Sequence, residues 1–233
     1  MKRKWTVTVV TLAAILTVIV AGVALFHDRK YNIISILIAL LSCVPFFLAY
    51  EKKQMKTTEM ILVAVMVALS SVGRIIFAPI PGFKPVTAIT VITALYFGPQ
   101  AGFLTGSLSA VISNLFFGQG PWTPFQMFGW GIIGLLGGLL QKWLLESNHW
   151  RIRLSLFGIF AGVAYSMIMD IWTVLSLDGT WSWTRYWTSI GLALPFTLEY
   201  AVSNVIFLMV LTKPIGTKLQ RVKKKYGLDE SYS

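Results

Sequence analysis

Charged residues are scarce in this sequence: Asp, Glu, Lys and Arg make up 12% of its 233 residues, against about a quarter in an ordinary soluble domain. Cys43 is the only cysteine, which excludes an intrachain disulfide and a cysteine-based metal cluster. The sequence has only two histidines, His27 and His149, and it lacks the H-E-x-x-H, G-x-S-x-G and Walker-type motifs. We therefore expect a protein that is not an enzyme, has no metal site and carries no covalently bound cofactor.

Apolar residues are correspondingly abundant, at 56% of the chain. Most of them lie in runs of about 18 to 25 residues, which at about 1.5 Å per helical residue can cross a hydrocarbon core of about 30 Å. A water-soluble fold could not bury so much apolar surface. The composition therefore predicts an all-α, polytopic transmembrane helical bundle in a lipid bilayer.

Proline, glycine and charged residues divide the chain into eight predicted spans. Two N-terminal spans, residues 5–26 and 32–50, are followed by a charged connector at 51–56. Six further spans follow at residues 57–78, 85–97, 99–117, 123–145, 154–177 and 186–211, of which 85–97 is short for crossing a membrane. We expect three parts: two additional helices in residues 1–56, a six-helix core in residues 57–213, and a basic cytoplasmic tail in residues 214–233.

The positions of the basic residues predict the orientation. With an inside N-terminus and eight spans, the inner segments hold 15 of the 20 Lys and Arg residues, and such an excess is typical of the cytoplasmic side. Both termini are therefore predicted to be cytoplasmic. The net charge of +11 could suggest nucleic-acid binding, but the charges lie between apolar runs, so we expect no nucleic-acid partner.

Two carboxyl groups, Asp170 and Glu199, lie inside predicted spans. A charge in lipid costs about 2.5–3.5 kcal/mol on insertion scales. Each group could therefore face a cavity or a partner, or it could bond to a neighbouring helix near the interface. A secondary transporter coupled to protons or sodium through one of them is an alternative function.

The predicted outer connectors combine aromatic rings with glycine, proline and a few polar groups. Rings at a membrane surface are often only anchors in the headgroup layer, but ligand sites also join aromatic walls to a few placed polar groups. We favour an outward-opening binding pocket. The residues expected to line it are Phe83, Lys84, Gln119, Trp122, Gln126, Asp170, Trp172, Trp181, Trp183 and Arg185.

Small residues recur at four-residue spacing, which puts them on one face of a helix and permits close helix contact. The clearest pairs are Ala64 with Ala68, Gly102 with Gly106, and Gly158 with Gly162. Most such pairs pack helices of the same chain. A scaffold protein that holds other helices on these faces is a further alternative.

Three elements together point to a family: the Ala64-x-x-x-Ala68 pair, the connector at residues 81–85, and the stretch at residues 117–127 that opens a glycine-rich helix. With these elements the chain resembles the substrate-binding S component of energy-coupling factor (ECF) vitamin transporters. The resemblance covers the six spans from residue 57 to 211. The two N-terminal spans are extra relative to the common six-helix form.

The resemblance implies a subunit of the bacterial plasma membrane that captures a vitamin outside and releases it inside. It would do so while docked on a transmembrane coupling subunit driven by two ATPases, so ATP would be used by the partners. Ala64 and Ala68 would form the face that meets the coupling subunit. The leading substrate from this resemblance is a corrinoid such as cobalamin or cobinamide, although a flavin or another aromatic precursor would also suit an aromatic site.

Overall fold

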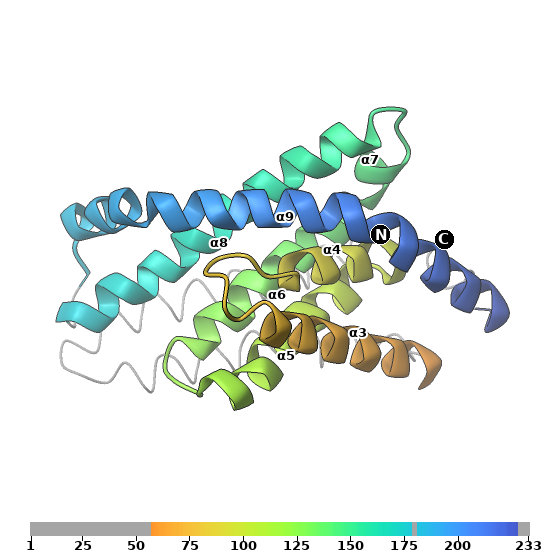
Figure 1. The fold of residues 1–233 in the computed structure, drawn as a ribbon, viewed down its shortest axis with the longest axis horizontal. Coiled ribbons are helices and arrows are strands. Elements are labelled where there is room, and N and C mark those ends of the chain that lie inside the picture. Colours follow the sequence, from red (N-terminus) through yellow and green to blue (C-terminus); the bar gives the residue numbers. More distant parts are fainter. Residues whose placement is uncertain (1–56, 179–180, 228–233) are drawn as a thin grey trace, which may run out of the picture.

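The computed structural model describes residues 57–178 and 181–227. In these ranges the chain forms α3 (Thr57–Ile76), α4 (Val86–Phe97), α5 (Pro99–Phe117), α6 (Thr123–Leu139), α7 (Gln141–Leu145), α8 (Trp150–Asp178) and α9 (Trp183–Lys225), with no strand among them. Figure 1 shows α8 and α9 crossing on one side of the bundle and α3 and α5 on the other. The predicted all-α helical bundle is confirmed, while the predicted spans at 5–26 and 32–50 lie outside the described residues.

Three of the described helices, α3, α8 and α9, are long and apolar enough to cross a membrane. In contrast, α4 has only 12 residues, about 18 Å of helix. A helix that is apolar all round belongs in a protein interior, and every α4 residue except Tyr96 is buried. Contacts with α3, α5, α6 and α9 surround α4, so the short span forms the centre of the core.

Close backbone contact joins α5 to α6. A Cβ added to Gly102 would lie 2.8 Å from the carbonyl oxygen of Gly134, and one added to Gly106 would lie 2.8 Å from the backbone nitrogen of Gly131. Only glycine permits this approach. A similar contact joins α8 to α9, where a Cβ on Gly162 would lie 2.6 Å from the Ala201 nitrogen. These small-residue pairs therefore pack helices of the same chain.

The predicted span at 123–145 is wrong as a single helix. Leu140, with φ −93° and ψ 8°, interrupts it, so that α6 ends at Leu139 and α7 begins at Gln141. Gly137 and Gly138 precede the break, and glycine has low helix propensity. The short α7 then turns against the start of α8, where the Arg153 guanidinium donates to the Trp143 carbonyl at 2.8 Å.

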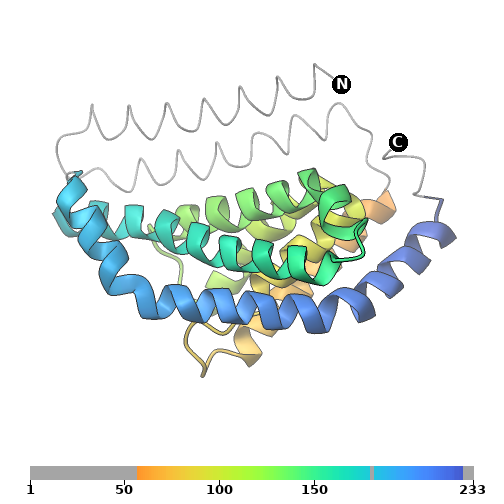
Figure 2. The same cartoon turned by 90° about the horizontal axis from the view of Figure 1, so that it is seen from above.

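The last helix does not end with the predicted span at Leu211, because α9 continues through Pro214 to Lys225. Tertiary packing supports the extra turns: Gly216 lies against the Tyr96 ring, and Leu219 is buried in the core. Figure 2 shows that α9 bends along the bundle. The two prolines inside α9, Pro195 and Pro214, account for bending, since proline removes a helical hydrogen bond.

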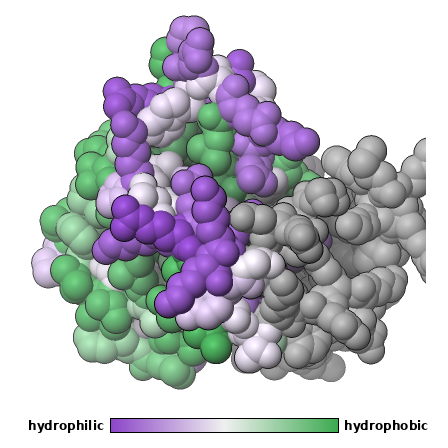
Figure 3. Space-filling model, turned by 90° about the vertical axis from the view of Figure 1, so that its right-hand side faces the viewer, coloured by the Kyte–Doolittle hydropathy of each residue, from purple (hydrophilic) through white to green (hydrophobic). Residues whose placement is uncertain are grey.

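Basic residues gather on the last turns of α9. Figure 3 shows the molecule from this end, with hydrophilic residues at the top and centre of the view and hydrophobic residues mainly to the left and below. The residues concerned are Lys213, Lys218, Arg221, Lys223, Lys224 and Lys225. Nearby, the Lys213 ammonium and the Arg151 guanidinium lie over the Trp150 ring at 6.0 and 5.5 Å. Basic and aromatic residues suit a membrane interface, and the cytoplasmic location of this end stays a prediction.

Candidate functional site

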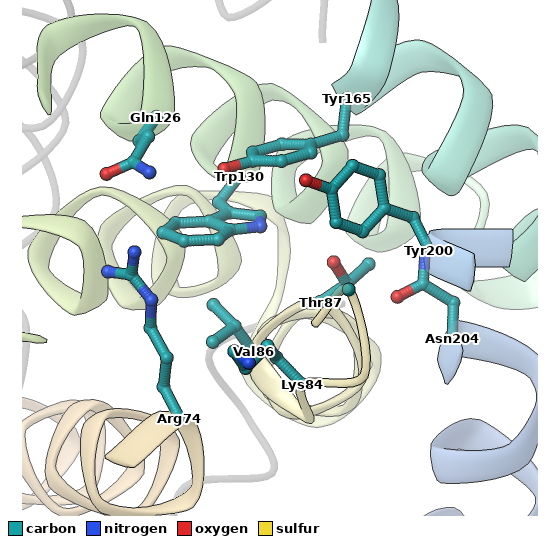
Figure 4. Close-up of a pocket in the computed structure, with 10 residues that line it drawn as sticks. Arg74, Lys84, Val86, Thr87, Gln126, Trp130, Tyr165, Tyr200 and Asn204 are labelled. Carbon is teal, nitrogen blue, oxygen red and sulfur yellow. The ribbon is translucent and has the colours of Figure 1, made fainter. Parts of the chain in front are cut away.

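A cavity of about 120 Å³ lies among α3, α4, α6, α8 and α9. Figure 4 shows its side chains converging from these helices. Its walls combine aromatic rings with charged and amide groups: Arg74, Gly82, Lys84, Val86, Thr87, Gln126, Trp130, Tyr165, Tyr200 and Asn204. An apolar or aromatic enclosure with a few placed polar groups is typical of a small-molecule site.

Arg74, in the last turn of α3, is one of two charged groups that line this cavity, the other being Lys84. Its guanidinium donates to the Ser113 hydroxyl and, at 2.7 Å, to Asn114 Oδ1. It also lies 4.7 Å from the Phe117 ring centroid and 5.1 Å from that of Trp130. Among the described residues no carboxylate forms an ion pair with it. Neutral dipoles and ring faces therefore stabilise the cation, and a ligand acceptor would stabilise it further.

This arginine fixes the direction of two buried amides. A guanidinium can only donate, so Asn114 must turn its Oδ1 toward Arg74. Its Nδ2 then donates to Gln126 Oε1 at 2.7 Å and to the Thr123 hydroxyl at 2.9 Å. Since Gln126 uses its oxygen toward Asn114, its amide nitrogen points to the cavity side, where it also faces the Tyr165 hydroxyl, as Figure 4 shows. The cavity thus receives donors from both Arg74 and Gln126.

Asn204, on α9, supplies a hydrogen-bond acceptor to the cavity. Its Nδ2 donates to the Gly158 carbonyl at 3.1 Å, which ties α9 to α8. The Asn204 oxygen is therefore left for the cavity, and Figure 4 shows it on the side of Thr87. Because Asn204 is 3% exposed, this acceptor is held in place by the helix packing around it. The cavity offers donors on one wall and an acceptor on another.

Three aromatic rings form the wall between α6, α8 and α9. Trp130 and Tyr165 stack with centroids 5.0 Å apart and an interplanar angle of 9°. Tyr200 meets Tyr165 edge to face at 5.4 Å and 88°. A planar aromatic ligand would stack on this wall only if the Trp130–Tyr165 pair separated or Arg74 moved from the Trp130 ring, over which its guanidinium lies at 5.1 Å.

The connector between α3 and α4 borders the cavity and carries two of the predicted site residues, Phe83 and Lys84. The Phe83 ring packs on Phe77 and Phe207, with centroids 5.7 and 4.8 Å away. The Lys84 ammonium donates to the carbonyls of Phe77 and Ile80 at 2.9 and 2.6 Å. Burial and then the charge of Arg74 lower the pKa of Lys84 below its ordinary value. Lys84 therefore holds the connector together as well as bordering the cavity.

The next connector carries Gln119 and Trp122, which do not line this cavity. Gln119 lies at the far end of the amide network: its Oε1 accepts from the Thr123 hydroxyl at 3.1 Å, and its Nε2 donates to the Val111 carbonyl at 2.8 Å. The Trp122 side chain is 37% exposed and lies against Gly120. Of the residues predicted from this part of the chain, only Gln126 borders the cavity.

The remaining predicted residues lie along α8 and the start of α9. Asp170 and Arg185 border a second cavity, of about 550 Å³, between these two helices. Trp172 packs on Phe125, with centroids 5.6 Å apart. Trp181 and Trp183 meet edge to face at 5.2 Å. The ten predicted residues are thus distributed over two cavities, two connectors and an aromatic cluster rather than one pocket.

Of the ten residues that line the first cavity, the predicted set contains only Lys84 and Gln126, and sequence reasoning missed the other eight, among them Arg74, Trp130, Tyr165, Tyr200 and Asn204. One signal was available for Arg74, since it lies inside the predicted span 57–78 and a charge within a span calls for an explanation. The charge count treats it only as one of the five Lys and Arg residues outside the inner segments. Trp130 and the two tyrosines are indistinguishable in sequence from ordinary core aromatics.

The chain matches a known protein family over most of its length. The family model of the S component of the ECF-type riboflavin transporter matches residues 54–221, which includes all the described helices except the end of α9. No curated protein and no solved structure gives a significant match to the chain. The described residues contain no group of three or more His, Cys, Asp or Glu that could hold a metal ion.

Proposed function

Because the chain belongs to the family of S components of ECF-type riboflavin transporters, we propose that it captures a flavin-type vitamin in the cavity at Arg74. Membership of this family makes it a membrane transport subunit that works with ECF transmembrane and ATPase components rather than an enzyme. The observation that carries the flavin proposal is the union of a stacked aromatic wall with a buried guanidinium and two oriented amides.

The chemistry of this cavity suits a planar ring with a polar edge. An isoalloxazine ring offers flat faces to Trp130 and Tyr165 and carries carbonyl acceptors and an imide donor along one edge. Arg74 and Gln126 supply donors for the carbonyls, and Asn204 supplies an acceptor for the imide. A charged donor to a ligand acceptor is worth about 1.5–3 kcal/mol, so Arg74 would contribute most of the polar affinity.

Size argues against a corrinoid in this cavity. A volume of about 120 Å³ is below the range of about 300–1,000 Å³ that is usual even for drug-sized ligands. A flat tricyclic ring would itself require the cavity to widen, and a corrin ring with its amide side chains would require a far larger opening. The corrinoid expectation drawn from sequence resemblance also finds no support in the family match, which names riboflavin. We therefore replace it with a flavin.

The coupling face proposed from sequence is consistent with the packing of α3. Ala64 and Ala68 are exposed, on a stripe that also exposes Ile61, Val65 and Leu69. The glycine pairs of α5 and α8 are used inside the chain, whereas this alanine pair has small side chains on an open face. Small residues permit close helix contact in membranes, so we propose that this stripe meets the transmembrane coupling subunit and that ATP is bound by the ATPase partners.

The test is a titration of the purified full-length chain in detergent with riboflavin and, separately, with cobinamide. Stacking quenches flavin fluorescence, so quenching reports binding directly. We expect saturable riboflavin binding and about a tenfold weaker affinity for Trp130→Ala and Arg74→Met, since a stacked ring is worth about 1–3 kcal/mol. Trp143→Ala and Arg151→Ala are matched controls, because both residues lie outside the two cavities. Saturable cobinamide binding with no flavin binding would overturn the proposal.

A further inference from the structure

The second cavity, between α8 and α9, directly adjoins the first, because Tyr200 borders both. It is an open groove of about 550 Å³, with apolar sides that include buried Val174 and the exposed side chains of Leu192 and Phe196. It extends from Tyr200 along α9 to Ser189 and Arg185. The two cavities are therefore neighbouring spaces with one aromatic side chain between them.

Asp170 on α8 is the buried carboxylate at this second cavity. It is 6% exposed, and its Oδ1 accepts a hydrogen bond from the Ser189 hydroxyl at 2.7 Å. Its Oδ2 is buried and has no hydrogen-bond partner among the residues that the structure describes. A buried polar atom without a partner is costly, and an intramembrane carboxylate is more costly still. A donor from a bound molecule would satisfy it.

The hydroxyl groups around Asp170 leave mainly acceptors for a ligand. Ser189 uses its hydrogen on Asp170 itself. Thr188 donates to the Thr184 carbonyl at 2.9 Å, and Thr173 donates to the Met169 carbonyl at 3.3 Å. Each hydroxyl retains oxygen lone pairs after its hydrogen is used. The cavity therefore suits a ligand part that is rich in hydroxyl donors and has an otherwise slender carbon chain.

We propose that the α8–α9 cavity is a second compartment of the substrate site, which holds a polyhydroxyl chain attached to the ring in the first cavity, with Asp170 as its main acceptor. The inference rests on the proposed flavin binding and deepens it. The first cavity is too small for a ring and a side chain together. Asp170 follows Tyr165 by five residues on the same helix, about 7.5 Å along its axis, which is within reach of an extended five-carbon chain.

The experiment compares two flavins that share the ring. Riboflavin carries the ribityl chain, whereas lumiflavin has a methyl group in its place. In Asp170→Ala the dissociation constant of riboflavin should rise about ten- to a hundredfold, the range for a hydrogen bond to a charged group, while that of lumiflavin should change less than about twofold. Glu146→Ala, which removes an exposed carboxylate after α7, should leave both constants unchanged.

Asp170→Asn provides a second variant of nearly the same shape, should the alanine variant fold poorly. It keeps one acceptor oxygen, so the loss for riboflavin should be smaller and lumiflavin binding should again be unchanged. If the unmodified chain binds neither flavin, the flavin proposal fails, and this inference fails with it. If it binds both and the Asp170 variants weaken both equally, or neither, then flavin binding stands and the second compartment is refuted.

Discussion

A substitution at Asn114 tests how the amide side chains orient the donors of the cavity, because Asn114 does not border the cavity itself. Its single side chain accepts from Arg74 and donates to both Gln126 and Thr123. In Asn114→Leu, the Gln126 oxygen loses its donor and Arg74 keeps only Ser113 among its hydrogen-bond acceptors. Gln126 would then be free to reverse its amide and withdraw its donor from the ligand.

The expected magnitudes follow from the groups left without partners. Each buried polar group without a partner costs about 1–3 kcal/mol, so Asn114→Leu should lose about 2–4 kcal/mol of stability. For a chain of this size that corresponds to a fall in Tm of about 5–15 °C. One misdirected donor should weaken flavin binding about tenfold, which is about 1.4 kcal/mol. Both quantities are measured on one detergent sample, by thermal unfolding and by flavin quenching.

Asn114→Asp separates the orientation of Gln126 from simple destabilisation. The new carboxylate still accepts from Arg74 but cannot donate, so Gln126 must turn its Nε2 away from the cavity. We expect nearly the full loss of affinity with a smaller loss of stability. Ser107→Ala is the matched control, since it removes another bond between α5 and α6, to the Met127 carbonyl at 3.0 Å, and should lower Tm alone. Unchanged flavin affinity in a folded Asn114→Asp protein would refute the claim that Asn114 orients the Gln126 amide.

Three other perturbations have clear expected outcomes. Gly106→Ala should destabilise the protein by about 1–3 kcal/mol through overpacking, seen as a lower Tm, whereas Gly191→Ala, in open space on α9, should not. The pKa of Lys84 is lowered in the folded chain, so the unfolded chain binds more protons as pH approaches about 10.5. The stability of the unmodified protein relative to Lys84→Met should therefore rise with pH. A difference in Tm between the two proteins that falls with pH would contradict this. Replacing Ala64 and Ala68 by leucine should abolish copurification of the coupling subunit without changing flavin affinity, and loss of both would show general misfolding instead.

Helix boundaries set by local chemistry were predictable from sequence. The break between α4 and α5 falls at Gly98 and Pro99, as predicted, because Gly98 adopts φ +90°, which other residues rarely adopt. The end of α9 was not predictable in this way. Pro214 is a helix breaker by itself, but the burial of Leu219 and the contact of Gly216 with α4 outweigh its cost. Tertiary contacts of this kind leave no local trace in the sequence.

The composition of the cavity was less predictable than the fold, because its residues come from the middle of helices. Connector residues such as Gln119 and Trp122 were predicted to line the site because glycine and proline lie next to them in the sequence. The structure instead gathers Trp130, Tyr165 and Tyr200 from three helices that are distant in the sequence. Hydrophobic pattern and spacing identify such rings only as buried. Their convergence depends on how α6, α8 and α9 pack, which the sequence pattern alone does not specify.

The polarity of the whole site nevertheless follows from one charge. Arg74 can only donate, so Asn114 must accept from it, and Gln126 must then accept from Asn114. This sequence of constraints makes the α3–α6 side of the first cavity a donor wall, while Asn204 and Asp170 place acceptors on α9 and α8. A ligand with acceptors at one edge of a ring and hydroxyl donors on a chain matches both sides. A ligand with only donors or only acceptors would leave the polar groups of one wall without hydrogen-bond partners. The free-energy cost of those buried groups would weaken its binding relative to a matching ligand.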